Sequence, residues 1–280
     1  CGVITIFLGF VFLLIIPDTP FKAWFLNDSE KKLIVQRLRR NQQGVGNHKF
    51  KRYQFGEALK DIRTWIMFFS SVSLNIPNGG IGTFSSLLIK GTMGYDENMT
   101  LLMGLPAGAC EFGGLILFGI ISPFIKNRMV LASITTIIAL IGSCLMSIAA
   151  IPKAQLAGYY LLMVSPGAMI VMFSIVSSNV SGYTKKTTVG AIYLIGYCVG
   201  NLIGPQTFKE KDAPEYRPAK VVMVAFYVIT LITLPILFVV NRRENKRRDK
   251  LAEEGGIQHE ENSEFSDLTD KENLEFRYVL

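Results

Sequence analysis

The sequence predicts an all-α membrane protein, a polytopic bundle of six full transmembrane helices preceded by one truncated helix. Of its 280 residues 50% are hydrophobic, and charged residues are almost excluded from six long stretches. Each stretch reaches the roughly 20 residues that a helix needs to cross a ~30 Å hydrocarbon layer. Helices without a polar face exclude a soluble α/β enzyme, and long apolar runs exclude an outer-membrane barrel. The stretches are residues 64–89, 100–125, 129–152, 154–184, 187–208 and 221–240.

The chain opens in a further apolar run, residues 2–16, directly after Cys1. No basic stretch precedes this run and no small-residue cleavage site follows it, which argues against a secretory signal. We therefore expect residues 1–16 to be a transmembrane helix truncated from a longer protein.

Residues 17–63 follow as a connector that carries eleven Lys and Arg residues. Asn27 followed by Glu30 has the spacing of a capping box, which starts a helix. The next apolar residues stand among basic ones and predict an amphipathic helix on the membrane surface, namely Leu33, Ile34 and Leu38. Gly44–Asn47 should end it.

A second short helix is expected from Phe55 to Ile62, bringing Trp65 to the headgroup level, where indole rings are favoured. The alternative for the connector is a solvated linker with some helicity.

The distribution of Lys and Arg sets the expected topology, because cytoplasmic loops are enriched in basic residues. The connector and residues 242–280 are rich in basic residues, whereas Lys90 stands alone in the loop before the second stretch. We expect both basic segments in the cytoplasm, with residues 64–241 as a six-helix transmembrane bundle and 242–280 as a disordered tail. Lys185 and Lys186 would then bind lipid phosphates or contribute to a gate.

Six stretches behind a basic connector resemble the second half of a major facilitator superfamily transporter, a fold of two six-helix bundles joined by a cytoplasmic loop. Three separated regions are similar, in order, to fungal allantoate permease-type transporters, the anion:cation symporter family. The first comprises Phe25–Glu30, Arg37–Gln42, Phe50–Gln54 and Ala58–Trp65. The second and third comprise Asn179–Thr188, Ile195–Asn201 and Gly204–Gln206, then Asp267–Asn273 and Phe276–Val279.

This resemblance covers essentially the whole chain and implies proton-coupled uptake of a small organic anion, at the plasma membrane. Substrates of the family include ureides, vitamins such as nicotinate, pantothenate or biotin, and short peptides. The resemblance also implies a partner, the missing N-terminal six-helix half, because the substrate of this fold sits between two halves. One departure lies in Gly119–Arg128, where Pro123 stands in place of an expected acidic residue and puts the charge-paired gate in doubt.

Glu111 is the one charged residue within the six stretches. An ionised carboxylate at membrane depth costs roughly 3 kcal/mol, so Glu111 should face the bundle interior or stay protonated. It is a candidate for proton coupling and for lining the substrate cavity, and the alternative is a protonated packing residue. Asn75 and Asn78 flank Pro77 ahead of two glycines, a composition that predicts a locally broken helix with both amides lining the cavity. The alternative there is a packing kink.

The stretch 187–208 contains two sets of residues that recur at helical spacing. Glycines every fourth residue predict close packing against a neighbouring helix, at Gly196, Gly200 and Gly204. A second face could present two phenols and an amide to a polar substrate, from Tyr193, Tyr197 and Asn201, although such stripes more often belong to a core.

Other chemistries are not supported by the sequence. The four cysteines lack metal-ligand spacing, and His48 and His259 fall in polar stretches, so neither a metal nor a cofactor is expected. Glu111 has no second acid or histidine at membrane depth, which argues against a membrane enzyme. The net charge of +7 follows topology, so no nucleic acid partner is expected. The competing hypothesis is a transport-incompetent product, or a membrane interaction subunit that needs a partner six-helix unit.

Overall fold

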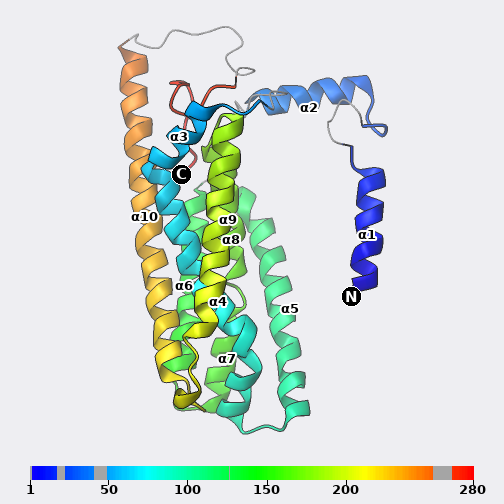
Figure 1. Ribbon diagram of the computed structural model, residues 1–280, viewed down its shortest axis with the longest axis vertical. Helices are drawn as coiled ribbons and strands as arrows, with labels where there is room; N and C mark the ends of the chain where they lie inside the picture. Colours follow the sequence, from blue (N-terminus) through cyan, green and yellow to red (C-terminus); the bar gives the residue numbers. More distant parts are fainter. Residues whose placement is uncertain (1, 18–22, 41–48, 126, 255–266) are drawn as a thin grey trace.

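The computed structural model describes residues 2–17, 23–40, 49–125, 127–254 and 267–280, and every regular element among them is a helix (Figure 1). Three helices precede the bundle: α1 (Gly2–Ile15), α2 (Asp28–Arg40) and α3 (Arg52–Lys60). The bundle consists of α4 (Ile62–Met93), α5 (Glu97–Ile121), α6 (Arg128–Ile148), α7 (Pro152–Leu162), α8 (Pro166–Asn179), α9 (Tyr183–Gln206) and α10 (Arg217–Glu253). Short 3-10 turns follow α5 and α9, at Ser122–Phe124 and Glu210–Asp212.

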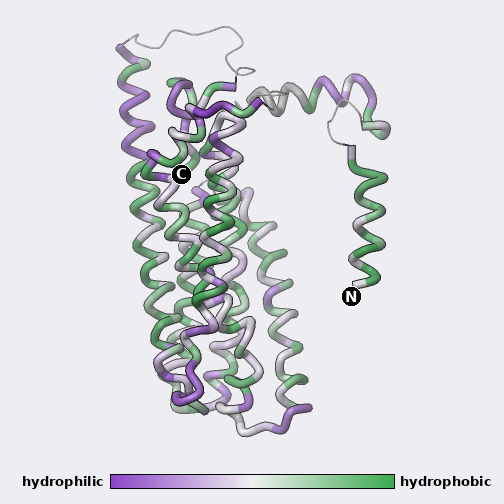
Figure 2. Tube along the Cα trace, viewed as in Figure 1, coloured by the Kyte–Doolittle hydropathy of each residue, from purple (hydrophilic) through white to green (hydrophobic). Residues whose placement is uncertain are grey.

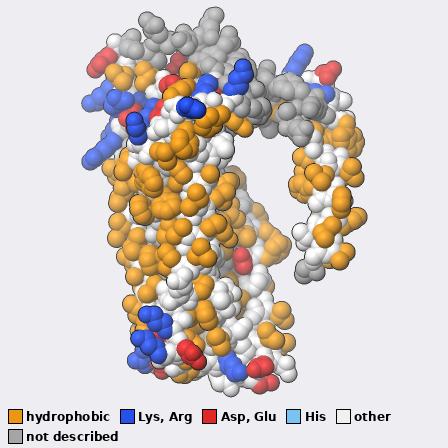
Figure 3. All heavy atoms as spheres, in the orientation of Figure 1, with side chains coloured by type: hydrophobic (Ala, Val, Ile, Leu, Met, Phe, Trp, Pro, Cys, Tyr) orange, Lys and Arg blue, Asp and Glu red, His pale blue; other side chains and the backbone are white. Residues whose placement is uncertain are grey.

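Five segments of the described chain are long and apolar enough to cross a membrane: α5 with its 3-10 turn, α6, the α7–α8 pair, α9 and α10. This confirms the predicted all-α membrane bundle. Helix α4, which contains the first of the six predicted stretches, has 32 residues, but its serines, asparagines and glycines lower its mean hydropathy. An apolar band covers the middle of the bundle and charged side chains gather at its two ends (Figures 2 and 3).

The two ends of the bundle differ in what they join. At one end, called the connector end, α3 leads into α4. The starts of α6 and α9 and the last turns of α10 lie at the same end. The other, the loop end, carries the turns between α4 and α5, α6 and α7, and α9 and α10. Caps fix two of the helix starts: Asp61 accepts a hydrogen bond from the backbone N–H of Arg63, and Asp96 from that of Met99.

The connector helices are close to the predicted ones. The Asn27 backbone N–H donates to Glu30 Oε2 at 2.9 Å at the start of α2, which is one of the two hydrogen bonds of the predicted capping box. Helix α3 starts at Arg52, three residues before the expected start, and ends at Lys60. Trp65 is partly exposed and its indole N–H donates to the carbonyl of Leu59. The expected helix end at Gly44–Asn47 lies outside the described residues.

Helix α4 is continuous through Pro77, so the expected local break near Asn75 and Asn78 does not occur. The reason is close packing against α9. A methyl group on Gly79 would lie 2.7 Å from the Cα atom of Asn201, so glycine there serves an approach of two backbones. The stretch 154–184, in contrast, is interrupted: α7 ends at Leu162 and α8 begins with Pro166, where proline suits a first turn.

Residues 267–280, called the strap, differ from the expected disordered tail. Helix α10 continues to Glu253, and the strap packs across the connector end with Thr269, Asp270, Phe276 and Tyr278 buried (Figure 1). The physical reason is that polar groups of this charged segment find partners in the bundle, which composition alone does not reveal. The bounds of the four predicted domains remain predictions.

Candidate functional site

Three amides link α4 and α9 near the middle of the bundle. Asn201 on α9 donates to Asn75 Oδ1 at 3.4 Å and accepts a hydrogen bond from Asn78 Nδ2 at 3.2 Å. Asn75, which is 1% exposed, donates in turn to the carbonyl of Ser71 at 2.8 Å. The structure thus brings together three of the predicted site residues, which satisfy one another in an apolar environment.

The three glycines at every fourth residue of α9 make this contact possible. A methyl group on Gly196 would lie 2.8 Å from the carbonyl oxygen of Phe68, and one on Gly200 would lie 2.7 Å from Val72 O. At Gly204 it would collide with the Ile76 carbonyl. All three therefore lie directly against the α4 backbone, the geometry that a packing role requires.

A cavity of about 130 Å³ lies between α4, α5 and the α7–α8 pair, and it contains Glu111 and Asn78. Its polar wall is completed by Ser85, Tyr159 and Ser165. The remaining lining residues are apolar or glycine, namely Ile81, Gly82, Leu162, Met163 and Pro166. The lining therefore offers one carboxylate, one amide and three hydroxyl groups.

The Glu111 side chain is half-buried and, within the described part of the chain, makes no hydrogen bond or ion pair. The cavity lining contains no Lys, Arg or His. A carboxylate in such a position can take up a proton or accept hydrogen bonds from N–H groups of a ligand.

The two predicted phenols are placed differently from Glu111. Tyr193 is 1% exposed and donates to the Met169 carbonyl of α8 at 3.2 Å, with its ring against Phe173. It is a core residue between α8 and α9 and lines no part of the cavity. Tyr197 is half-buried one turn further along α9 and does not line the cavity either.

Sequence reasoning missed Ser85, Tyr159 and Ser165. Hydroxyl groups are frequent in helices and commonly bond to their own backbone, so the sequence carries no signal that separates these three from the others. Their place in the cavity follows from how α4, α7 and the turn between α7 and α8 pack.

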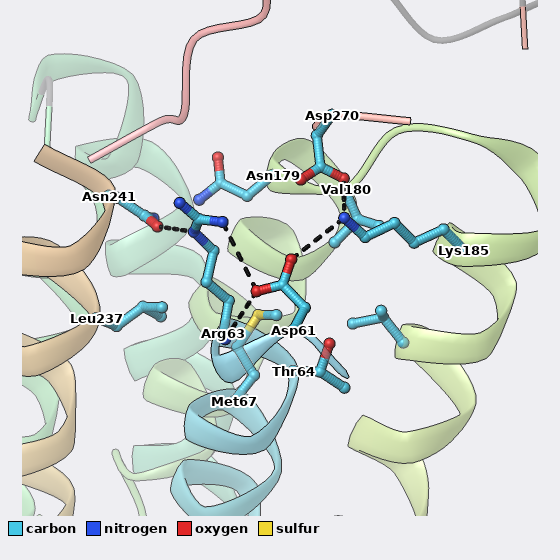
Figure 4. A pocket seen from close by; sticks show the side chains of 11 residues that line it. Asp61, Arg63, Thr64, Met67, Asn179, Val180, Lys185, Leu237, Asn241 and Asp270 are labelled. Atoms are coloured by element: carbon cyan, nitrogen blue, oxygen red, sulfur yellow. Dashed lines mark hydrogen bonds and ion pairs between the residues drawn. The ribbon is translucent and has the colours of Figure 1, made fainter. Parts of the chain in front are cut away.

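A second cluster of functional groups occupies the connector end (Figure 4). Lys185, only 1% exposed, pairs with Glu57 at 2.8 Å, Asp61 at 3.2 Å and Asp270 at 2.7 Å. Lys185 is thus enclosed by carboxylates and does not face lipid, whereas the alternative expectation, a contribution to a gate, stays a prediction. A buried ammonium needs such partners, because desolvation without them is costly.

Asp61 is the shared carboxylate of this cluster. It also faces Arg63 at 3.6 Å and Lys271 at 3.4 Å. Burial acts to raise the pKa of Asp61, but Lys185, the backbone N–H of Arg63, the Arg63 guanidinium and Lys271 together lower it below its usual value. Asp61 therefore stays ionised and holds the cations of three segments.

Arg128 lies near the position where the charge-paired gate was in doubt. Its guanidinium donates to Ser174 Oγ and Ser178 Oγ, both at 2.7 Å, at the end of α8. No carboxylate within the described ranges pairs with it. The start of α6 is therefore held by two serine hydroxyl groups and by the Leu280 oxygen, which accepts a hydrogen bond from the Arg128 backbone N–H at 2.8 Å.

Comparison with known proteins adds the family context. The chain matches the model of the Major Facilitator Superfamily over residues 1–205. It is 74% identical over 280 residues to an uncharacterized transporter of Schizosaccharomyces pombe, covering 100% of this chain and 55% of that protein. It is 53% identical over 289 residues to the allantoate permease of Saccharomyces cerevisiae, covering 100% and 53%. It is 36% identical over 289 residues to a thiamine pathway transporter of the same yeast, covering 99% and 53%. The chain spans about half the length of these curated relatives.

Proposed function

The chain belongs to the major facilitator superfamily, and from this premise we propose that it forms one six-helix half of a proton-coupled transporter for a small organic anion. Membership makes it an integral membrane carrier and not an enzyme. The observation that carries the more specific proposal is Glu111, a carboxylate that lines a cavity with Asn78 and has no partner among the described residues.

Proton coupling follows from the charge of that cavity. An ionised Glu111 would repel an organic anion, whereas a protonated Glu111 is neutral and can donate a hydrogen bond to it. Binding of the anion and of the proton would then favour each other, because the proton removes the charge that repels the anion and the bound anion disfavours the ionised form of Glu111. Uptake should increase as the external pH falls.

Allantoate is the first substrate to test, because a relative with 53% identity is named allantoate permease. Ureides share amide N–H groups, which can donate hydrogen bonds to the carbonyl oxygen of a protonated Glu111 and to the Asn78 amide oxygen. Vitamins and short peptides are the other classes that we propose, and the thiamine pathway relative supports a test of vitamins.

A complementary six-helix half is the proposed partner. The cavity of this chain has walls from α4, α5 and the α7–α8 pair, and alternating access requires an opposing bundle that moves against them. We propose that the connector end faces the cytoplasm, at the plasma membrane, because the basic connector enters there. The competing function is an interaction subunit without transport that needs a partner six-helix unit.

The test is uptake of allantoate into liposomes that contain the full-length transporter, with acid outside. Glu111→Gln should abolish accumulation driven by pH and leave downhill exchange. The matched control is Glu97→Gln on the same helix, whose carboxylate is 85% exposed and pairs with Lys90 at the loop end. If Glu111→Gln accumulates allantoate with the pH dependence of the parent, Glu111 is a packing residue and the coupling proposal fails.

The 280-residue chain alone gives a second test. Because it supplies one side of the cavity, it should give no uptake in liposomes where the full-length transporter does. Uptake by the monomeric chain would contradict the proposed need for a second half.

A further inference from the structure

The strap, residues 267–280, is not explained by the proposed transport site, because none of its residues lines that cavity. It nevertheless contacts α3, the starts of α4, α6 and α9, and the ends of α8 and α10, all at the connector end. The contacts are of three kinds: charge pairs, a buried guanidinium and amides that bind the strap backbone.

Two carboxylates of the strap enter ion pairs with the bundle and the connector. Asp270 lies 2.7 Å from Lys185 Nζ at the start of α9, and Asp267 lies 2.8 Å from Lys51 Nζ just before α3. Both carboxylates are nearly buried, at 2% and 5% exposed. Asp267 Oδ1 also accepts a hydrogen bond from the Tyr183 backbone N–H.

Arg248 on α10 is built to bind the strap. It is 1% exposed, and its guanidinium donates to the carbonyls of Asp270 at 2.7 Å, Asn273 at 3.1 Å and Phe276 at 2.7 Å. Its other charge partner is Glu244 on its own helix, at 3.0 Å. Arg248 Nη2 also donates to the Tyr278 hydroxyl at 3.3 Å, so without the strap four of its hydrogen bonds would be lost and this cation would face solvent or an apolar surface.

Two bundle amides bind the strap backbone as a neighbouring strand would. Asn245 donates to the Tyr278 carbonyl at 2.8 Å and accepts from its N–H at 2.9 Å. Asn179 does the same with Val279, at 2.9 Å and 2.6 Å. Paired donor and acceptor contacts of this kind recognise an extended peptide.

Tyr278 supplies the side-chain specificity. Its ring lies between two guanidinium groups, 4.1 Å from that of Arg63 and 4.9 Å from that of Arg248. Its hydroxyl donates to Asp270 Oδ2 at 2.6 Å, so the two recognised residues of the strap also fix each other.

The strap and α9 together hold the last helix of the connector. Gln54 on α3 accepts from the Thr184 N–H at 3.0 Å and donates to the Asp267 carbonyl at 3.0 Å. Glu57 on α3 pairs with Lys185 and accepts from Thr269 Oγ1 at 3.1 Å. Helix α3 is thus joined to the bundle largely through strap residues and the first turn of α9.

We propose that the connector end of the bundle is a peptide-docking site whose ligand is the strap, and that docking fixes α3 to the bundle so that switching between the two access states depends on it. A connector that is firmly attached transmits the movement of one half to the other, whereas a released α3 would let the halves move independently. The second part of this inference rests on the proposed transport function, whereas the first part does not.

Docking can be measured without transport. A protease site is inserted between residues 254 and 267 of the full chain, which folds intact and is then cleaved. The strap should stay bound after cleavage and should be displaced by excess synthetic peptide of residues 267–280. Asp270→Asn removes the ion pair with Lys185, and Tyr278→Phe removes the hydrogen bond that Arg248 Nη2 donates to the Tyr278 hydroxyl. Peptides carrying either change should compete at least about tenfold more weakly, as expected for the loss of a contact with a charged group.

Arg277→Ala is the matched control peptide. Arg277 pairs with Asp249 on the exposed surface, so this peptide should compete nearly as well as the parent. Immediate loss of the strap on cleavage, or equal competition by the three variant peptides, would overturn the docking site.

The consequence for transport is tested in the full-length transporter with the double variant Asp270→Asn and Tyr278→Phe. The maximal rate should fall several-fold with an unchanged KM, and strap peptide enclosed in the liposomes should restore the rate. A changed KM with an unchanged maximal rate, or no change in either, would overturn the effect on switching. Absence of uptake by the parent would contradict the proposed function and leave the peptide competition result standing.

Discussion

The connector end and the central cavity differ in whether their charged groups have partners. At the connector end, Lys185 has three carboxylate partners and Arg248 binds three strap carbonyls. In the cavity, Glu111 has no partner among the described residues. Since buried polar groups are normally satisfied, a charge with every partner in place serves structure, and a charge without one is available to a ligand or a proton. The comparison therefore separates the junction that holds the bundle from the cavity that we propose binds the substrate and the proton.

The largest expected effect is on stability at the connector end. Lys185→Ala would leave Glu57, Asp61 and Asp270 close together without their shared cation. Removing one side of a buried ion cluster destabilises by about 3–5 kcal/mol. Thermal unfolding of the purified chain in detergent measures this change.

Lys90→Ala is the control for Lys185→Ala, because Lys90 pairs with the exposed Glu97 at 3.3 Å. An exposed pair of this kind contributes less than about 1 kcal/mol. Equal losses for the two variants would show that the cluster at Lys185 does not hold the junction together.

A smaller effect is expected where α4 and α9 meet. Gly204→Ala places a methyl group against the Ile76 carbonyl, and overpacking of this kind costs about 1–3 kcal/mol. Gly190→Ala on the same helix has no atom within 4 Å of the new methyl group and should be neutral or slightly stabilising. Equal free energies of unfolding for the two variants would contradict the close approach of α4 and α9.

The pH dependence of strap docking should be flat across neutrality. The lowered pKa of Asp61 gives stability that is present above the ordinary value of about 4 and lost as pH falls through the lower folded value. Burial, and after it the neighbouring Asp270, raises the pKa of Tyr278. The stability that Tyr278 contributes is therefore present below its ordinary pKa of about 10 and is lost as the pH rises through its folded pKa. The hydrogen bond to Asp267 raises the pKa of Lys51. The stability that this pair contributes is therefore also lost at alkaline pH, as the pH rises through the folded pKa of Lys51. Strap dissociation followed against pH should show a plateau between these limits, and a transition near pH 7 would contradict this assignment.

The smallest stability effect is expected in the cavity. Glu111→Gln removes a charge that has no partner in the described chain, and the amide has nearly the same shape. The free energy of unfolding should change by less than about 1 kcal/mol. A loss as large as that of Lys185→Ala would place Glu111 among the structural charges.

The sequence predicted the bundle well because lack of charge over about 20 residues is a direct physical requirement of a membrane helix. It also singled out Asn75, Asn78, Asn201 and Glu111, because polar groups at membrane depth are costly and therefore easy to recognise. It did not predict the continuous α4, since the residues that suggest a broken helix also permit close packing.

The strap and the full cavity wall depended on tertiary structure. Asp267 and Asp270 lie in a charged segment typical of disorder, and their partners Lys51 and Lys185 are far away in the sequence. Tyr193 and Tyr159 are similar residues in similar helices, yet only Tyr159 reaches the cavity. Helix rotation decides such cases, and a single sequence does not report it.

The central claim is that the unpaired carboxylate of Glu111 takes up the proton that accompanies the substrate. Calorimetry of substrate binding to the full-length transporter, in buffers of different ionisation enthalpy, counts the protons taken up at constant pH. We predict close to one proton per substrate for the parent and for Glu97→Gln, and none for Glu111→Gln. The same proton uptake in Glu111→Gln as in the parent would contradict the account.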